Sequence, residues 1–282
     1  MNCFMFPGQP LSHSGVIPED SDFHHIARLV HERAGLNLND FNWTGQQATE
    51  SVALQVYGVA MSLYRARVLS REGIRPRIIA EHSMGIYPAL VASGALPEGD
   101  ALELTARIGR CMSVMSEKGE YALGCIVGLP AETVLAIAEN SSVFMANYNT
   151  SRHFLLAGKR RNIESMEAEA LAGGAFSVKL FPCDAPLHTP LMESISARLR
   201  EIIAEYRYGE PALPLMNHID QNFLTSADVP DFLLRELLQP VYWERSYQAL
   251  REAGVTKYHE VGVGDALKKY NRWIESEAAR SL

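Results

Sequence analysis

The middle of the chain alternates short apolar runs with amphipathic segments, and this order limits the folds that the chain can adopt. Runs of this length suit buried strands, whereas apolar residues repeating every three or four positions suit helices. The order of the segments is strand, helix, strand, strand, helix, strand. The four expected strands lie at 122–129, 143–147, 154–157 and 176–181, and the two expected helices at 131–140 and 162–172.

The same reading extends to both sides of this segment. Strands are expected at 3–6, 77–80, 215–219 and 258–261, and helices at 20–35, 47–71, 84–92, 99–116, 189–206, 229–239, 243–253 and 265–280. Alternation of strands and helices predicts a mainly parallel sheet with helices on both faces. The β-α-β-β-α-β order is that of the ferredoxin-like unit. We therefore expect an α/β fold, with a large α/β domain made of residues 1–118 and 184–282 and a ferredoxin-like insert at 119–183.

Composition and charge exclude several classes of protein. A hydrophobic content of 47% is ordinary for a globular chain and excludes a disordered one. The net charge of −7 argues against nucleic acid as a partner, and no apolar run approaches the roughly 18 residues of a membrane span. The nine histidines include no HExxH pair, so we expect no metal. The four cysteines lack CxxC spacing and indicate reduced thiols in a cytoplasmic protein: Cys3, Cys111, Cys125 and Cys183.

The stretch from residue 78 to residue 85 is the most informative about chemistry. A β-branched run, Ile78-Ile79-Ala80, leads to Ser83, and a helix is expected to begin at once. This is the context of a nucleophile elbow, in which a tight turn raises the serine hydroxyl above the sheet of an α/β-hydrolase-like domain. The usual pattern is G-x-S-x-G, but Glu81 takes the place of the first glycine. A serine before a helix is also a common N-cap, so the local pattern leaves both interpretations open.

Further motifs occur in a fixed order along nearly the whole chain. They are Phe6-Pro7-Gly8-Gln9, Asn147-Tyr148-Asn149, Asp184-Ala185-Pro186-Leu187-His188 with Met192, Pro240-Val241-Tyr242-Trp243 and Glu260-Val261-Gly262-Val263-Gly264. Together with the elbow they resemble the acyl-carrier-protein malonyltransferase family, which includes the malonyl-CoA:acyl-carrier-protein transacylases and the acyltransferase domains of polyketide synthases. The family places a small subdomain where the ferredoxin-like segment lies here.

The resemblance implies a role for each matching residue. Ser83 would be the nucleophile and His188 the base that takes its proton. The backbone amides of Gln9 and Met84 would stabilise the oxyanion, and a backbone carbonyl near Glu236 would orient His188. The residues expected in or beside the substrate pocket are His82, Ile108, Asn149 and Glu236.

One departure from the family pattern concerns the acyl group. Malonyl-specific members pair the substrate carboxylate with the arginine of R-G-x-x-M, and here Gly109 and Met112 place Ile108 at that position. On a helix, Arg107 and Arg110 would point about 100° and 200° away from it. A malonyl carboxylate buried without a partner would cost several kcal/mol. The sequence therefore predicts an uncharged acyl group.

The resemblance implies an enzyme, and three functions are compatible with it. The first is an acyltransferase of fatty-acid or polyketide-type biosynthesis, which moves an acyl group from coenzyme A to the phosphopantetheine thiol of an acyl carrier protein through Ser83. The second is a thioester hydrolase that uses the same residues, and the third is a non-catalytic module that binds the carrier protein. We expect acyl-CoA and an acyl carrier protein as partners, no nucleic acid, no membrane and no permanently bound cofactor, and the sequence is compatible with a monomer.

Overall fold

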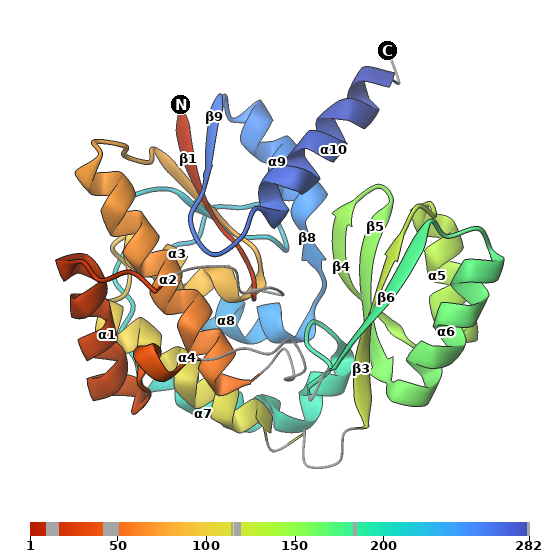
Figure 1. Cartoon of the computed structure of the whole chain (residues 1–282), viewed down its shortest axis with the longest axis horizontal. Coiled ribbons are helices and arrows are strands. Elements are labelled where there is room, and N and C mark those ends of the chain that lie inside the picture. Colours follow the sequence, from red (N-terminus) through yellow and green to blue (C-terminus); the bar gives the residue numbers. More distant parts are fainter. Residues whose placement is uncertain (10–16, 42–50, 114, 116–119, 183–184, 281–282) are drawn as a thin grey trace.

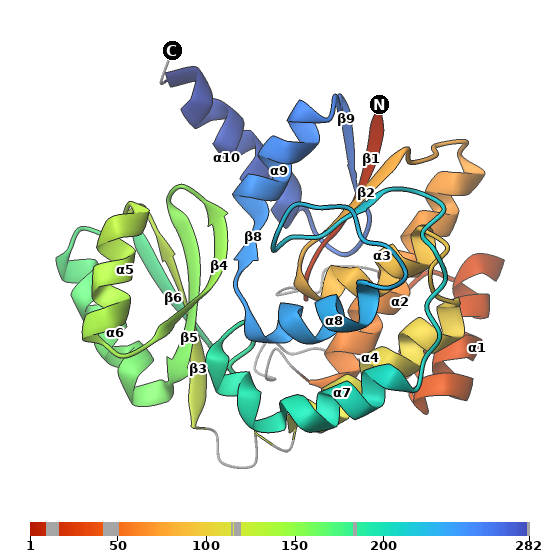
Figure 2. The ribbon, with the colours of Figure 1, turned by 180° about the vertical axis from the view of Figure 1, so that it is seen from behind.

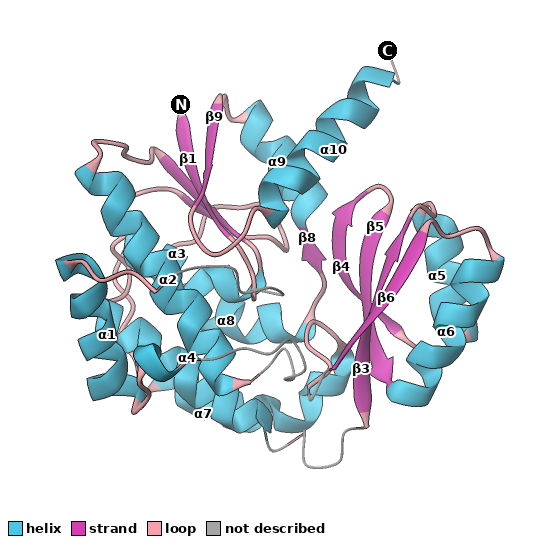
Figure 3. Ribbon diagram, viewed as in Figure 1, coloured by secondary structure: helices cyan, strands magenta, loops and turns pink. Residues whose placement is uncertain are grey.

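The computed structural model describes residues 1–9, 17–41, 51–113, 115, 120–182 and 185–280. It is an α/β fold in which a larger body with a parallel sheet lies beside a smaller body with a mostly antiparallel sheet (Figures 1 and 3). The strands are β1 (Asn2–Phe6), β2 (Ile78–Glu81), β3 (Tyr121–Val127), β4 (Phe144–Thr150), β5 (His153–Lys159), β6 (Ser177–Pro182), β7 (Leu215–Met216), β8 (Val241–Tyr242) and β9 (Lys257–Glu260). The α-helices are α1 (Ser21–Ala34), α2 (Val52–Arg71), α3 (Ile86–Ala92), α4 (Glu98–Ser113), α5 (Ala131–Asn140), α6 (Arg160–Ala172), α7 (Ser196–Ala204), α8 (Val229–Leu238), α9 (Trp243–Glu252) and α10 (Ala266–Arg280), and the 3₁₀ helices are η1 (Leu38–Asp40), η2 (Ser83–Gly85) and η3 (Pro190–Ile195).

The sheet of the larger body has the order β7-β2-β1-β9, and all of its pairings are parallel. Side chains alternate along β1, as the pleat of a strand requires. Cys3 and Met5 pack in the core under α9 and α10, whereas Phe4 and Phe6 pack in the core formed with α2, α3 and α8. The sheet is therefore buried between two layers of helices, which explains its continuous apolar runs.

The smaller body has the strand order β6-β3-β5-β4, with antiparallel pairings, and α5 and α6 cover one face. This confirms the ferredoxin-like arrangement (Figures 1 and 2). In β3, Ala122 and Ile126 face the helices, whereas Leu123 lies in a separate cluster on the opposite face. That opposite face is turned toward the larger body.

Strand β8 joins the two bodies and was not predicted. Val241 and Tyr242 pair in parallel with Asn147 and Tyr148 of β4, so a segment of the larger body adds a fifth strand to the small sheet. The sequence predicts only the start of a helix here, and α9 does begin at the next residue, Trp243. A strand of two residues is too short to leave a recognisable sequence pattern. It forms only because the tertiary structure brings Val241 and Tyr242 beside β4.

Two elements are shorter than the sequence predicts. The strand expected at 215–219 ends at Met216, because Oδ1 of Asn217 accepts hydrogen bonds from the amides of Ile219 (3.0 Å) and Asp220 (2.7 Å) and turns the chain. The expected helix 189–206 begins as η3 and becomes α7 at Ser196. Residues 47–50 of the helix expected at 47–71 lie outside the described residues.

None of the helices in the described part of the chain is both long and apolar enough to cross a membrane.

Candidate active site

Ser83 lies in a tight turn between β2 and α3. Its φ is +57°, in the left-handed region that non-glycine residues rarely adopt. The N-cap position of η2 belongs to His82, so Ser83 is not a helix cap. A Cβ atom on Gly85 would lie 2.2 Å from the carbonyl oxygen of Phe6, so the turn packs directly against the end of β1. This is the geometry of a nucleophile elbow.

His188 approaches the elbow from the loop before η3. Its Nε2 lies 2.6 Å from Oγ of Ser83, and its Nδ1 lies 2.5 Å from the backbone oxygen of Glu236. A carbonyl only accepts hydrogen bonds, so Nδ1 carries the ring proton and Nε2 presents its lone pair to the serine hydroxyl. The amide of His188 also donates to the carbonyl of Leu237 (2.9 Å). The carboxyl end of α8 therefore fixes both the backbone and the imidazole ring of His188.

The surroundings keep His188 neutral. The side chain is 4% exposed, and burial, followed by the neighbouring His218, lowers the pKa of His188 to about 3. A neutral imidazole with a free lone pair can accept a proton from a hydroxyl group.

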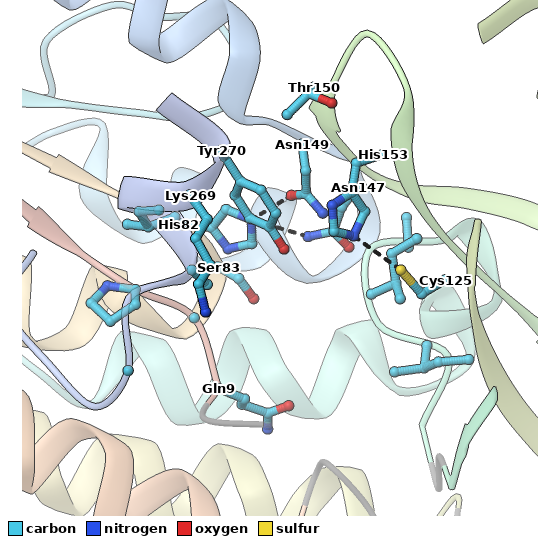
Figure 4. A pocket seen from close by; sticks show the side chains of 18 of the residues that line it. Gln9, His82, Ser83, Cys125, Asn147, Asn149, Thr150, His153, Lys269 and Tyr270 are labelled. Atoms are coloured by element: carbon cyan, nitrogen blue, oxygen red, sulfur yellow. Dashed lines mark hydrogen bonds between the residues drawn. The ribbon is translucent and has the colours of Figure 1, made fainter. Parts of the chain in front are cut away.

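A cavity of about 530 Å³ opens at Ser83 between the two bodies (Figure 4). The open face of the small sheet forms an apolar wall, and α10 contributes the opposite side with Tyr270 and Trp273. Gln9 lines the cavity together with Ser83 and His188, whereas Met84, directly after the serine, is buried in the core of the larger body. The residues of the apolar wall are Leu123, Cys125, Val127, Ala146, Leu155 and Phe181.

His82 and Asn149, both expected at the pocket, contact each other there. Nε2 of His82 donates to Oδ1 of Asn149 over 2.9 Å, and Asn147 lies beside them (Figure 4). Burial lowers the pKa of His82 to about 4, so the ring is neutral. The contact fastens β4 of the small sheet to the elbow.

Ile108, the residue expected to discriminate between acyl groups, does not lie at the cavity. Ile108 is fully buried in the core of the larger body and is not among the described residues that line the cavity. Arg107 donates to Glu205 (2.5 Å), and Arg110 donates to the carbonyl of Ala34 (2.5 Å). Both arginines are therefore engaged away from Ser83.

No local sequence pattern indicates that Glu81 and His218 form a pair. Both side chains are fully buried, and burial raises the pKa of Glu81 well above its usual value. Oε1 of Glu81 accepts from the amide of His218 (3.0 Å), and Oε2 of Glu81 lies 2.8 Å from Nδ1 of the same histidine. Glu236 lies close by, with Oε2 3.9 Å from Nδ1 of His188. From the sequence, Glu81 is only a departure from the elbow pattern, because its partner lies 137 positions away along the chain.

One group of buried side chains has the composition of a metal site. Ligand-type atoms of His188, His218 and Glu236 lie within 4.8 Å of one another. Both ring nitrogens of His188 are already occupied by Ser83 and by the carbonyl of Glu236, so His188 is not free to bind a metal.

Cys125 and His153 form a pair on the cavity wall, with Sγ of the cysteine 3.0 Å from Nε2 of the histidine. Burial raises the pKa of this thiol to about 12, so it is not a ready nucleophile.

The chain is similar to known proteins in both sequence and fold. Residues 21–249 match the family described as acyl transferase domain. The chain is 28% identical to malonyl CoA-acyl carrier protein transacylase of Escherichia coli K12, over 94% of this chain and 89% of that protein. It is 25% identical to polyketide biosynthesis protein PksE of Bacillus subtilis, over 99% of this chain and 37% of that protein. Among solved structures it is similar to an acyl-carrier-protein S-malonyltransferase of Burkholderia pseudomallei, with a TM-score of 0.89, 27% identity and coverage of 98% and 93%.

A parallel α/β body with an inserted ferredoxin-like unit and a serine elbow defines the class of the fold. The chain belongs to the acyl transferase domain family.

Proposed function

We propose that this protein transfers an acyl group from a coenzyme A thioester to the phosphopantetheine thiol of an acyl carrier protein, in fatty-acid or polyketide-type biosynthesis. The observation that carries the proposal is the 2.6 Å contact between Oγ of Ser83 and Nε2 of His188 at the edge of a cavity of about 530 Å³. The relatives named for carrier-protein transacylation and for polyketide biosynthesis support a carrier protein as the acceptor. In this proposal residues 1–118 and 184–282 form the catalytic domain, and the insert at 119–183 covers the acyl group.

The chemistry proceeds in two half-reactions. Nε2 of His188 takes the proton of Ser83 while Oγ attacks the thioester carbonyl, and the amides of Gln9 and Met84 stabilise the oxyanion. When the intermediate collapses, the carbon–sulfur bond breaks and the coenzyme A thiol leaves with the proton from His188. In the second half-reaction His188 takes the proton of the carrier thiol, and the thiolate attacks the carbonyl carbon of the serine ester. The bond between that carbon and Oγ of Ser83 then breaks, and Ser83 recovers the proton from His188. The coenzyme A thioester is a substrate, and no permanently bound cofactor is required.

The charges around the cavity favour an uncharged acyl group. Among the described residues that line the cavity, Lys269 is the only lysine or arginine. Its Nζ lies 2.7 Å from the carboxylate of Asp265. Arg107 and Arg110 are bound elsewhere. A malonyl carboxylate would therefore meet no unpaired cation in the described part of the cavity, which disfavours it by several kcal/mol. The apolar wall instead suits a hydrocarbon chain.

The proposal is tested by following acetyl-CoA and octanoyl-CoA with and without a holo carrier protein. We expect stoichiometric acylation of the enzyme alone and rapid formation of acyl carrier protein when the thiol is added. Free acid as the main product in both conditions would instead identify a hydrolase. Carrier binding with no acylation would identify a non-catalytic module.

A further inference from the structure

The strands of the small sheet carry positive charge in a protein whose net charge is −7. Strands β3, β4, β5 and β6 contain two lysines, Lys159 and Lys179, and no aspartate, glutamate or arginine. Lys179 pairs with Cys125 of the cavity wall, and the side chains of directly opposed residues lie on the same face of a sheet. Lys159 pairs in the same way with Tyr121, which packs beside Leu123 on the open face. Both lysines therefore lie on the face that is turned toward the larger body.

Lys179 lies at the rim of the cavity. Its two neighbours on this face, Cys125 and Phe181, line the cavity, whereas Lys179 itself is exposed on the edge strand β6. Its Nζ lies 5.0 Å from the centre of the Phe181 ring, and it forms no ion pair with a described residue. Burial raises the pKa of the Cys125 thiol, and the charge of Lys179 opposes that rise, so the cation acts on the cavity wall. A cation in this position is available to a negatively charged ligand.

A row of paired residues, one from each strand, connects this cation with the elbow. The row is, in order, Lys179, Cys125, Leu155 and Asn147. Nδ2 of Asn147 lies 3.4 Å from Nε2 of His82, the residue before Ser83 (Figure 4). Neighbouring strands are about 4.8 Å apart, so the three steps place the backbone of Lys179 about 14 Å from the elbow end of the row.

This distance fits the phosphopantetheine arm that coenzyme A and carrier proteins share. From the thioester sulfur to the phosphorus the arm has about 14 atoms, nearly as many as the backbone of five extended residues, and it spans about 17 Å. A thioester at Ser83 can therefore bring its phosphate to the rim where Lys179 lies. The carboxylate of a malonyl group is only three carbon atoms from the serine oxygen and does not span this distance.

We propose that Lys179 is a substrate-binding residue that holds the phosphate of the phosphopantetheine arm at the rim of the cavity. Its N–H groups donate to the phosphate oxygens, and the arm extends from there across the open face to Ser83. Coenzyme A and the carrier protein place the same phosphate there in turn, in the two half-reactions. No bond is made or broken at Lys179, so it lowers KM for both partners with little effect on kcat. The inference rests on the proposed function, because it assigns Lys179 to the substrates of that reaction.

Lys179→Met tests the assignment, because methionine keeps an apolar contact with Phe181 and removes the charge. The substrates are acetyl-CoA, acetyl-4′-phosphopantetheine and acetyl-pantetheine, of which only the last lacks the phosphate. We expect kcat/KM for acylation to fall about fivefold with the two phosphorylated substrates, chiefly through KM, which is the effect of losing one exposed ion pair. With acetyl-pantetheine it should stay unchanged. Lys179→Arg should restore the parent values.

Lys159→Met is the matched control, since it removes the same charge from the same face. Its partner Tyr121 is four residues along β3 from Cys125, the partner of Lys179, so kcat/KM should not change in this variant. The second half-reaction is compared in the same way, with a holo carrier protein and with pantetheine as acceptors. Only transfer to the carrier protein should fall in Lys179→Met.

Binding of coenzyme A, measured by calorimetry without any acyl group, separates this inference from the proposed function. Weaker binding in Lys179→Met, together with no acyl-enzyme in the parent, would contradict the proposed function alone. Equal losses with acetyl-pantetheine and acetyl-CoA, or an equal loss in Lys159→Met, would overturn the inference. A changed preference between acetyl-CoA and octanoyl-CoA would overturn it too, by assigning Lys179 to the acyl group. No loss with any substrate would leave Lys179 only the role of keeping the exposed edge of β6 from pairing with another chain.

Discussion

Ser83 and His188 both have a left-handed backbone, with φ of +57° and +62°, and their side chains meet in a 2.6 Å hydrogen bond. Each conformation is uncommon for a residue with a side chain and costs of order 1–3 kcal/mol. The surrounding structure holds both: the elbow packs on the end of β1, and the amide of His188 bonds to the carbonyl of Leu237. Two strained residues brought together from 105 positions apart mark the place where the fold is specialised for chemistry.

Replacing His188 with alanine should slow acylation by about 10²–10⁴-fold, the usual effect of losing a general base. The measurement is single-turnover release of coenzyme A from acetyl-CoA. His24→Ala is a matched control, because His24 is exposed on α1. An equal loss in both variants, or none in His188→Ala, would assign the base to another residue.

The acylation rate should hardly change between pH 8 and pH 5. An ordinary histidine has a pKa near 6.5 and is protonated progressively below it, but burial lowers the pKa of His188 to about 3. The base therefore stays unprotonated through this range, and its loss by protonation begins only at lower pH. A rate that halves near pH 6.5 would contradict the buried, neutral ring.

Gly85→Ala should destabilise the protein by about 1–3 kcal/mol, as overpacking of a filled site does, and should impair acylation as well. The added Cβ would lie 2.2 Å from the carbonyl oxygen of Phe6, so the elbow and β1 must separate. Gly99→Ala is the control, since its Cβ would contact only the flexible side chain of Arg33. Urea unfolding of both variants measures the difference, and equal stabilities would contradict the close packing of the elbow.

Uncharged acyl-CoA should be preferred over malonyl-CoA by about 10²-fold or more in kcat/KM, because the malonyl carboxylate meets no unpaired cation among the described residues that line the cavity. Arg107→Gln and Arg110→Gln should leave this ratio unchanged, since both arginines are bound outside the cavity. A clear preference for malonyl-CoA that either substitution abolishes would show that an arginine reaches the acyl group.

The sequence predicted the fold where local pattern and packing agree. The ferredoxin-like unit follows from apolar runs such as that of β3, in which Ala122 and Leu123 face opposite sides, and its order is confirmed. What the sequence did not reveal depends on contacts between distant residues. The pair of Glu81 and His218 and the added strand β8 exist only after folding, and no local rule indicates them.

The central claim is that Ser83 carries the acyl group, and mass spectrometry of the protein mixed with acetyl-CoA or octanoyl-CoA tests it most directly. We predict one acyl group per molecule, located on the peptide that contains Ser83, and no adduct on Ser83→Ala. An adduct of normal yield on Ser83→Ala, or an acyl group found at Cys125 in the parent, would contradict the account.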